Sequence, residues 1–216
     1  MTARIPTWRR WLRHGALALS AVLAAGCADE VSPQTQTIAA RLAASRNADT
    51  VDLFTFDDAE AADSWRIIND TVMGGRSSSQ MTVTDAGTGV FRGEVSLANN
   101  GGFAHTRSMA GPYDLSAYDG LAVRVRGDAK RYDLTLKLDR AFDGVMYQTR
   151  FEVQSAGWTE VRLPFADFVP TYHGRVLTDR PPLDPAKIRT IGFIISDKQE
   201  GPFRLEVDWI RAYRGG

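Results

Sequence analysis

LAVRVRGDAKRYDLTLKL, residues 121–138, contains two runs in which apolar side chains alternate with polar or small ones. Successive side chains of a β-strand point to opposite faces, so each run predicts a strand with one buried and one solvated face. The Gly127-Asp128 pair between the two runs is a turn signal. The stretch therefore predicts two half-buried strands separated by a turn.

The same alternation recurs along the chain, at residues 147–153, 158–163 and 202–210. Residues 191–196 are more continuously apolar, which predicts a central strand covered on both faces. Many short strands at regular spacing, with little helical periodicity, indicate an all-β protein. We expect a two-sheet antiparallel jelly-roll sandwich.

Residues 1–26 combine four arginines, no acidic residue and a short apolar run that ends in small side chains. This order is typical of a bacterial secretory signal. Leu23-Ala24-Ala25-Gly26-Cys27 resembles a lipobox, so we expect cleavage before Cys27 and lipidation of its thiol. The alternative is an ordinary cleaved signal with an incidental cysteine. With Ala28 after the cysteine, the lipobox implies a lipid-anchored protein of the bacterial cell envelope, facing the periplasm from the outer membrane.

The rest of the chain is expected to form one domain, residues 51–215, behind a lipidated tether at residues 27–50. We expect the tether to be solvated, with a short helix from Ile38 to Arg46. Cys27 is the only cysteine, so an apolar core must stabilise the domain without disulfides. Because the four arginines leave with the signal, the remainder is mildly acidic, which argues against nucleic-acid binding.

WRIINDTVMGGRS, residues 65–77, resembles the opening signature of the complex I intermediate-associated protein 30 family. Later stretches agree in the same order, and the resemblance runs from about Val51 to Tyr213. It implies a galactose-binding-domain-like fold, which agrees with the sandwich expected from the alternation. It also implies a non-enzymatic role, because the mitochondrial members are chaperone-like assembly factors for respiratory complex I. The wider fold group includes carbohydrate-binding modules.

The glycine loop, residues 69–77 of that signature, has two interpretations. Adjacent glycines permit positive φ or close backbone approach, so the polar side chains could face a ligand. The alternative is a structural turn in which Met73 fills the core while Asn69 and Asp70 hydrogen-bond the loop backbone. The candidate binding residues are Asn69, Asp70, Met73, Gly74, Gly75, Arg76 and Ser77.

A second candidate site is a sheet face. If the apolar positions of residues 121–126, 132–138 and 147–153 face the core, three consecutive strands present a row of cationic and amide groups outward. Such a row could bind carboxylates or hydroxyl-rich ligands. The alternative is a solvated face balanced by Asp133 and Glu152. The candidates are Arg124, Arg126, Lys137, Gln148 and Arg150. The alternation places three nearby aromatic side chains on the core side: Tyr132, Tyr147 and Trp158.

Asp57 and Asp208, near the two ends of the domain, are candidates for a structural calcium site. The first and last strands of this fold group often lie side by side, and hard oxygen ligands suit Ca²⁺. The alternative is a pair of solvated edge carboxylates. We expect His105 and His173 at the surface or in turns, because a zinc site needs about four clustered ligands. No other cofactor is expected.

The sequence lacks the Gly-x-Ser-x-Gly and His-Glu-x-x-His motifs of common hydrolases. We therefore expect a non-enzymatic envelope lipoprotein, an assembly or chaperone-like factor for membrane or respiratory protein complexes with a protein partner in the envelope. The alternative is a carbohydrate-binding module that recognises envelope glycans. Neither role involves nucleic acid, and the lipid anchor makes the contact with the membrane.

Overall fold

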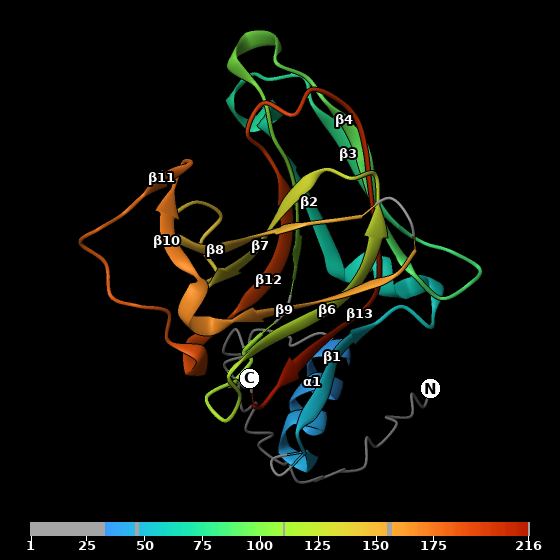
Figure 1. The fold of residues 1–216 in the computed structure, drawn as a ribbon, viewed down its shortest axis with the longest axis vertical. Helices are drawn as coiled ribbons and strands as arrows, with labels where there is room; N and C mark the ends of the chain where they lie inside the picture. Colours follow the sequence, from blue (N-terminus) through green and yellow to red (C-terminus); the bar gives the residue numbers. More distant parts are fainter. Residues whose placement is uncertain (1–32, 46–47, 110, 155–156, 216) are drawn as a thin grey trace, which may run out of the picture. The chain divides into compact units, whose positions relative to one another are not determined.

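A computed structural model describes residues 33–45, 48–109, 111–154 and 157–215. The predicted signal segment and Cys27 lie outside the described residues. Over the described part the chain forms α1 (Pro33–Ala44) and the strands β1 (Thr50–Thr55), β2 (Trp65–Asn69), β3 (Ser78–Val83), β4 (Gly89–Val95), β5 (Ala104–Ser108), β6 (Gly120–Gly127), β7 (Arg131–Lys137), β8 (Met146–Glu152), β9 (Thr159–Pro164), β10 (Val169–Tyr172), β11 (Arg175–Val176), β12 (Thr190–Ile195) and β13 (Gly201–Tyr213). The short 3-10 helices are η1 (Ala59–Ser64), η2 (Asp70–Met73), η3 (Ala98–Asn100), η4 (Phe165–Asp167) and η5 (Pro185–Lys187). Figure 1 shows these elements as a ribbon.

The strands form two antiparallel sheets. A six-stranded sheet runs in the order β3-β4-β13-β6-β9, with β1 also paired to β13, and a seven-stranded sheet runs β11-β10-β8-β7-β12-β5-β2. β13 has thirteen residues, so its first half can pair with β4 while its second half pairs with β1. The predicted all-β jelly-roll sandwich is confirmed, as is the expected pairing of the first and last strands.

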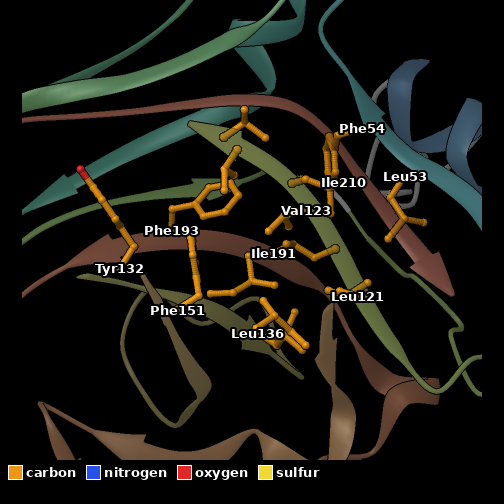
Figure 2. Close-up of a cluster of buried hydrophobic side chains, with 14 of the residues drawn as sticks. Leu53, Phe54, Leu121, Val123, Tyr132, Leu136, Phe151, Ile191, Phe193 and Ile210 are labelled. Atoms are coloured by element: carbon orange, nitrogen blue, oxygen red, sulfur yellow. The ribbon is translucent and has the colours of Figure 1, made fainter. Parts of the chain in front are cut away.

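Inward-facing side chains of both sheets form one hydrophobic core between them (Figure 2). Leu121, Val123 and Leu136, which the alternation placed inside, have no exposed surface. Phe193 lies at the centre, with its ring centroid 6.0 Å from Trp65 and 6.3 Å from Phe151. Aromatic pairs at such distances add to the stabilisation from burial alone. Both sheets are therefore held in position by the core that they share.

One expectation about those outer faces is wrong. β6 belongs to the six-stranded sheet, whereas β7 and β8 belong to the seven-stranded sheet. The turn after Gly127 therefore crosses from one sheet to the other instead of closing a hairpin. Arg124 and Arg126 consequently lie on one outer face of the sandwich, and Lys137, Gln148 and Arg150 lie on the opposite one. The three strands do not present a common polar row.

The helix before the domain also differs from the expectation. α1 begins at Pro33, five residues earlier than predicted, and proline suits the first turn of a helix because its missing N–H needs no partner there. Ile38 is only 3% exposed and belongs to the hydrophobic core, with Leu42 packed against it. This part of the expected solvated tether is therefore packed on the domain. Within the described residues, no helix combines the length and apolarity needed to cross a membrane.

Candidate functional site

The glycine loop is held by one buried carboxylate. Asp70, which has no exposed surface, accepts hydrogen bonds from the backbone N–H of Ser77 at 2.9 Å and from the Ser77 hydroxyl at 2.5 Å. It also accepts from the N–H groups of Gly102 at 2.7 Å and Phe103 at 3.3 Å. Burial alone would raise the pKa of Asp70, but these four hydrogen bonds lower it overall. Asp70 therefore stays ionised and joins the glycine loop to the segment before β5.

The glycines around Asp70 are required by close approach. A Cβ added at Gly75 would lie 2.4 Å from the Asp70 carboxyl, and one added at Gly101 would lie 2.5 Å from it. Gly74 has a φ of +89°, a conformation that favours glycine. Of the two interpretations of the glycine loop, the structural one therefore applies to Asp70, Gly75 and Ser77.

The loop does expose a small apolar surface. Val72 and Met73, which we call the apolar tip, are 54% and 58% exposed. Met73 does not fill the core, and that part of the structural alternative is wrong. The Asn99 side-chain amide donates to the Gly74 carbonyl at 3.1 Å, and the Asn69 side-chain oxygen accepts from Ser79 at 2.6 Å. The tip is thus supported from both sides.

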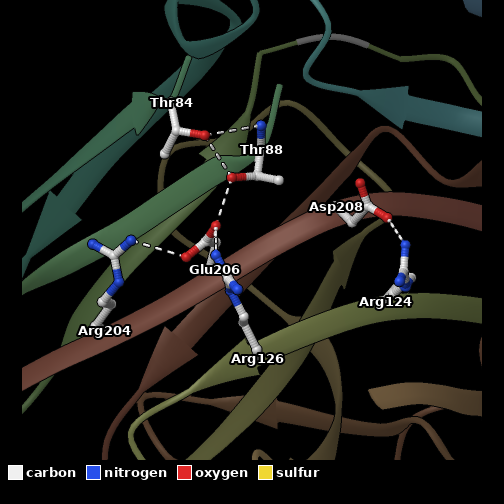
Figure 3. A network of polar contacts seen from close by, with 7 residues as sticks. All are labelled: Thr84, Thr88, Arg124, Arg126, Arg204, Glu206 and Asp208. Carbon is white, nitrogen blue, oxygen red and sulfur yellow. Dashed lines mark hydrogen bonds and ion pairs between the residues drawn. The ribbon is translucent and has the colours of Figure 1, made fainter. Parts of the chain in front are cut away.

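On the outer face of the six-stranded sheet, one carboxylate is shared between two guanidinium groups (Figure 3). Glu206 accepts from Arg126 at 2.8 Å, from Arg204 at 2.9 Å and from the Thr88 hydroxyl at 2.7 Å. Burial opposes ionisation, but the hydrogen bonds from Arg126, Thr88 and Arg204 lower the pKa of Glu206 to about 2. The carboxylate therefore ties β13 to β6 and to the turn before β4.

The other candidate on this face is also paired. Arg124 lies 2.5 Å from the Asp208 carboxylate. The guanidinium carbons of Arg124 and Arg126 lie 5.2 Å and 4.6 Å from the centroid of the Trp158 ring. Trp158 therefore packs on the outer face, and the expectation that it faces the core is wrong. Arg124 and Arg126 act first as structural partners of carboxylates.

The opposite outer face, on the seven-stranded sheet, holds the remaining candidates. Arg150 is paired with Asp133 at 2.9 Å and with Asp197 at 2.6 Å. Gln148 accepts from the Thr171 hydroxyl at 3.1 Å. Lys137 points to the same face, but its side chain is 1% exposed. Lys137, which was expected on a solvated face, is thus covered from solvent.

The cover is the segment between β7 and β8. Its residues Asp139–Gly144, which we call the strap, lie over this sheet face. Lys137 Nζ donates to the carbonyl of Asp143 at 2.9 Å, and Arg107 Nη2 donates to the carbonyl of Phe142 at 3.2 Å. The Asp143 carboxylate accepts from Tyr172 at 3.1 Å and lies 3.0 Å from His173 Nε2. The strap is therefore bound through the backbone carbonyls of Phe142 and Asp143 and through the Asp143 carboxylate.

Sequence reasoning missed two buried residues on this sheet face. Arg107 was not singled out, and His105, expected at the surface, is buried with its Nε2 3.0 Å from the Thr135 hydroxyl. One sequence signal could have indicated the burial of His105. Gly192 interrupts the apolar strand β12, and a Cβ there would lie 2.8 Å from the Thr135 hydroxyl and 2.9 Å from His105. A glycine within a strand marks such a close approach.

Comparison with known proteins gives the family. The family model described as complex I intermediate-associated protein 30 matches residues 54–207. The chain belongs to this family. It is 30% identical over 186 residues to the protein named complex I intermediate-associated protein 30, mitochondrial, of Mus musculus, a match that covers 74% of this chain and 55% of the mouse protein. The Drosophila melanogaster protein of the same name is 25% identical over 187 residues, covering 76% of this chain and 63% of the fly protein. The chain thus spans somewhat more than half the length of these relatives.

Solved structures confirm the fold of this complex I intermediate-associated protein 30 family member. A family 11 carbohydrate-binding module from Clostridium thermocellum, in complex with a β-1,3-1,4-mixed-linked tetrasaccharide, matches with a TM-score of 0.57 at 18% identity. The match covers 74% of this chain and 95% of the module. At this identity the likeness shows the fold alone, a galactose-binding-like jelly roll.

The calcium candidates of this family member gain no support from the structure. Asp208 is engaged by Arg124, and Asp57 is exposed after β1. Among the described residues, no three His, Cys, Asp or Glu side chains are grouped closely enough to hold a metal ion. Calcium prefers about 6–8 oxygen ligands, more than these two carboxylates supply.

Proposed function

We propose that this chain is a non-enzymatic assembly or chaperone-like factor that binds a protein partner through the apolar tip. The observation that carries the proposal is the exposure of Val72 and Met73 on a loop fixed by the buried Asp70. Large apolar side chains held outward on a rigid base are suited to contact another protein. The relatives' name, which places them with intermediates of complex I, supports a role in assembling membrane or respiratory complexes.

The rigid base matters for affinity. Binding is weaker when a loop must become ordered on association, because the lost conformational entropy opposes binding. A preformed loop avoids that cost. The four hydrogen bonds to Asp70 and the support from Asn99 order the tip before any partner arrives. The family signature therefore contributes to binding indirectly, by presenting its two apolar residues.

We place this function in the bacterial cell envelope, on a protein anchored by lipid at Cys27 and facing the periplasm from the outer membrane. The lipobox-like sequence before Cys27 supports this placement. Cys27→Ala should move the protein from the membrane fraction to the soluble fraction of cells in which the unaltered protein is membrane-bound. An unchanged distribution, or the absence of a lipid-modified peptide in mass spectrometry, would contradict the anchor.

The binding proposal is tested by co-purification from detergent-solubilised membranes. A Val72→Ser, Met73→Gln double variant should recover roughly tenfold less of a specific partner than the unaltered protein, because apolar anchors dominate such contacts. The matched control is Val176→Ser, which changes an exposed valine at the opposite edge of the seven-stranded sheet. A photo-crosslinking amino acid at position 72 should attach to the same partner. Equal recovery by the double variant would refute the role of the tip.

A second candidate function is recognition of an envelope glycan. It is favoured by the fold shared with a module solved in complex with a tetrasaccharide. A glycan array with residues 33–215 separates the two functions. Specific glycan binding that persists in the Val72→Ser, Met73→Gln variant would favour this second candidate.

A further inference from the structure

Two cations are buried beneath the strap, on the outer face of the seven-stranded sheet. Lys137 is 1% exposed and Arg107 is 8% exposed. The strap offers them the neutral main-chain carbonyls of Asp143 and Phe142, at 2.9 Å and 3.2 Å. Ammonium and guanidinium groups form stronger hydrogen bonds with anions than with neutral carbonyls. Lys137 also has one carboxylate partner, Asp139, whereas the hydrogen bond of Arg107 to the strap is to a neutral carbonyl. The two buried cations therefore share one carboxylate between them.

Positive charge is in excess around these two groups. Asp139, at 3.2 Å from Lys137 Nζ, contributes a carboxylate that is itself more than half exposed. Burial, and then repulsion from Arg66 on β2, lowers the pKa of Arg107, although the Asp139 carboxylate acts in the opposite direction. Burial, and then the charges of Arg107 and Lys137, lowers the pKa of His105 to about 3, so this imidazole is neutral and adds no charge of its own. The Asp143 carboxylate is turned toward Tyr172 and His173 instead.

The same face carries an unused hydrogen-bonding group. Thr190 pairs with Lys137 across β12 and β7, and its buried hydroxyl has no partner within the described part of the chain. A buried polar group without a partner costs free energy unless a ligand or water satisfies it. Gly192, the next residue on this face of β12, has no side chain to cover the neighbouring Thr135 and His105. Lys137, Arg107 and Thr190 thus provide donors on one face for the oxygens of an anion.

Apart from its contacts with the two buried cations, the strap is held by contacts at the surface. The Asp143 carboxylate, Tyr172 and His173 are exposed, and Phe142 is 54% exposed. Segments with few buried apolar contacts open at low free energy while the core remains folded. The sheet face beneath does not depend on the strap, because its strands are fixed by the core.

We propose that the sheet face beneath the strap is a binding site for an organic carboxylate, closed in this structure by the strap's own carbonyl groups. The carboxylate replaces these carbonyls as the partner of Lys137 and Arg107, and Thr190 donates to it. The site is on a different surface from the apolar tip and does not rest on the protein-binding function. Binding requires the strap to open, so the apparent affinity is reduced by the fraction of molecules in which it is closed.

Isothermal titration calorimetry with glucuronate and succinate tests the site, with glucose as the neutral control. Asp143→Ala releases the strap from Tyr172 and His173 without touching the two cations, and it should bind carboxylates roughly tenfold more tightly than the unaltered protein. Adding Lys137→Met to Asp143→Ala should abolish that binding. Lys198→Met, which removes an exposed lysine in another turn, should have no effect in the same background. Binding of glucuronate alone identifies a sugar acid, and binding of both acids identifies a general carboxylate site.

A second measurement covers the case in which Lys137→Met does not fold. Adding glucuronate or succinate to the unaltered protein should speed amide hydrogen exchange at residues 139–144, because the ligand displaces the strap. Arg107→Gln should weaken this response. The proposal is overturned if neither acid binds Asp143→Ala at millimolar concentration, if glucose binds equally well, or if bound acid leaves strap exchange unchanged.

Discussion

Replacing Asp70 by asparagine should destabilise the protein by about 2–3 kcal/mol, because hydrogen bonds to a buried charged acceptor are worth more than neutral ones. The amide nitrogen of the variant would also face the N–H donors of Ser77, Gly102 or Phe103. Urea denaturation at pH 7.5 measures the change as a shift in midpoint at constant slope.

The matched control is Asp57→Asn, which alters an exposed aspartate and should change stability by less than about 0.5 kcal/mol. If both variants unfold at the same urea concentration, Asp70 does not hold the glycine loop.

The second residue-scale prediction concerns pH and His105. Its pKa is about 3 in the folded protein, chiefly through burial, against 6.5 for the free side chain. Between these values the unfolded chain binds the proton and the folded one does not, so stability is full above pH 6.5 and falls as pH falls through this window. From pH 7.5 to 5 the loss through this one group is about 2 kcal/mol.

His105→Gln retains a group that can hydrogen-bond Thr135 but cannot titrate, so its stability should be flatter over this range. Urea midpoints at pH 7.5, 6 and 5 measure the difference. Parallel pH profiles for the two proteins would mean that His105 is not shielded from protonation.

At the scale of elements, alternation predicted the strands well but not their partners. Residues 121–126 and 132–138 fall within or beside β6 (Gly120–Gly127) and β7 (Arg131–Lys137). Period two tells which side chains of one strand share a face, but it does not tell which sheet the strand joins. A short turn can close a hairpin or cross between sheets, and the chain after Gly127 crosses. The predicted polar row failed for that reason.

The shared carboxylate on the six-stranded sheet gives a prediction at this scale. Glu206→Gln removes the charge that joins Arg126 of β6 to Arg204 of β13 and leaves the two guanidinium groups side by side. We expect a loss of about 1–3 kcal/mol, since the carboxylate is buried and accepts three hydrogen bonds. Thermal unfolding in low salt measures it.

Glu160→Gln is the control on the same face. Glu160 is paired with Arg162 at 3.7 Å, and both side chains are about half exposed. An exposed pair contributes about 0–1 kcal/mol, so this variant should remain close to the unaltered protein. Equal losses for the two glutamates would show that the buried network adds nothing beyond a surface ion pair.

For the molecule as a whole, alternation was enough for the all-β fold class but not for the assignment of strands to sheets or for the buried polar groups. In the described part of the chain, the apolar positions of the strands of both sheets form one core, which is what a sandwich requires. Lys137, Arg107 and His105 carry no comparable signal, because a polar residue at an outward position is normally solvated. Lys137 and Arg107 are covered by a strap whose path is set by contacts with distant residues, Tyr172 and His173. Such contacts are not encoded in local pattern.

The extent of the folded unit can itself be tested through α1. Ile38 is buried in the hydrophobic core, so Ile38→Ala should cost about 2–4 kcal/mol in global stability if the helix folds together with the sandwich. Arg41→Ala, on the exposed side of α1, should change stability little, because alanine favours a helix. Urea unfolding followed by tryptophan fluorescence reports on the sandwich, and hydrogen exchange of residues 38–44 reports on the helix. If Ile38→Ala shifts both the fluorescence midpoint and the exchange of residues 38–44, α1 is part of one cooperative domain. If the helix exchanges freely and Ile38→Ala leaves the fluorescence midpoint unchanged, α1 is a tether that does not stabilise the sandwich.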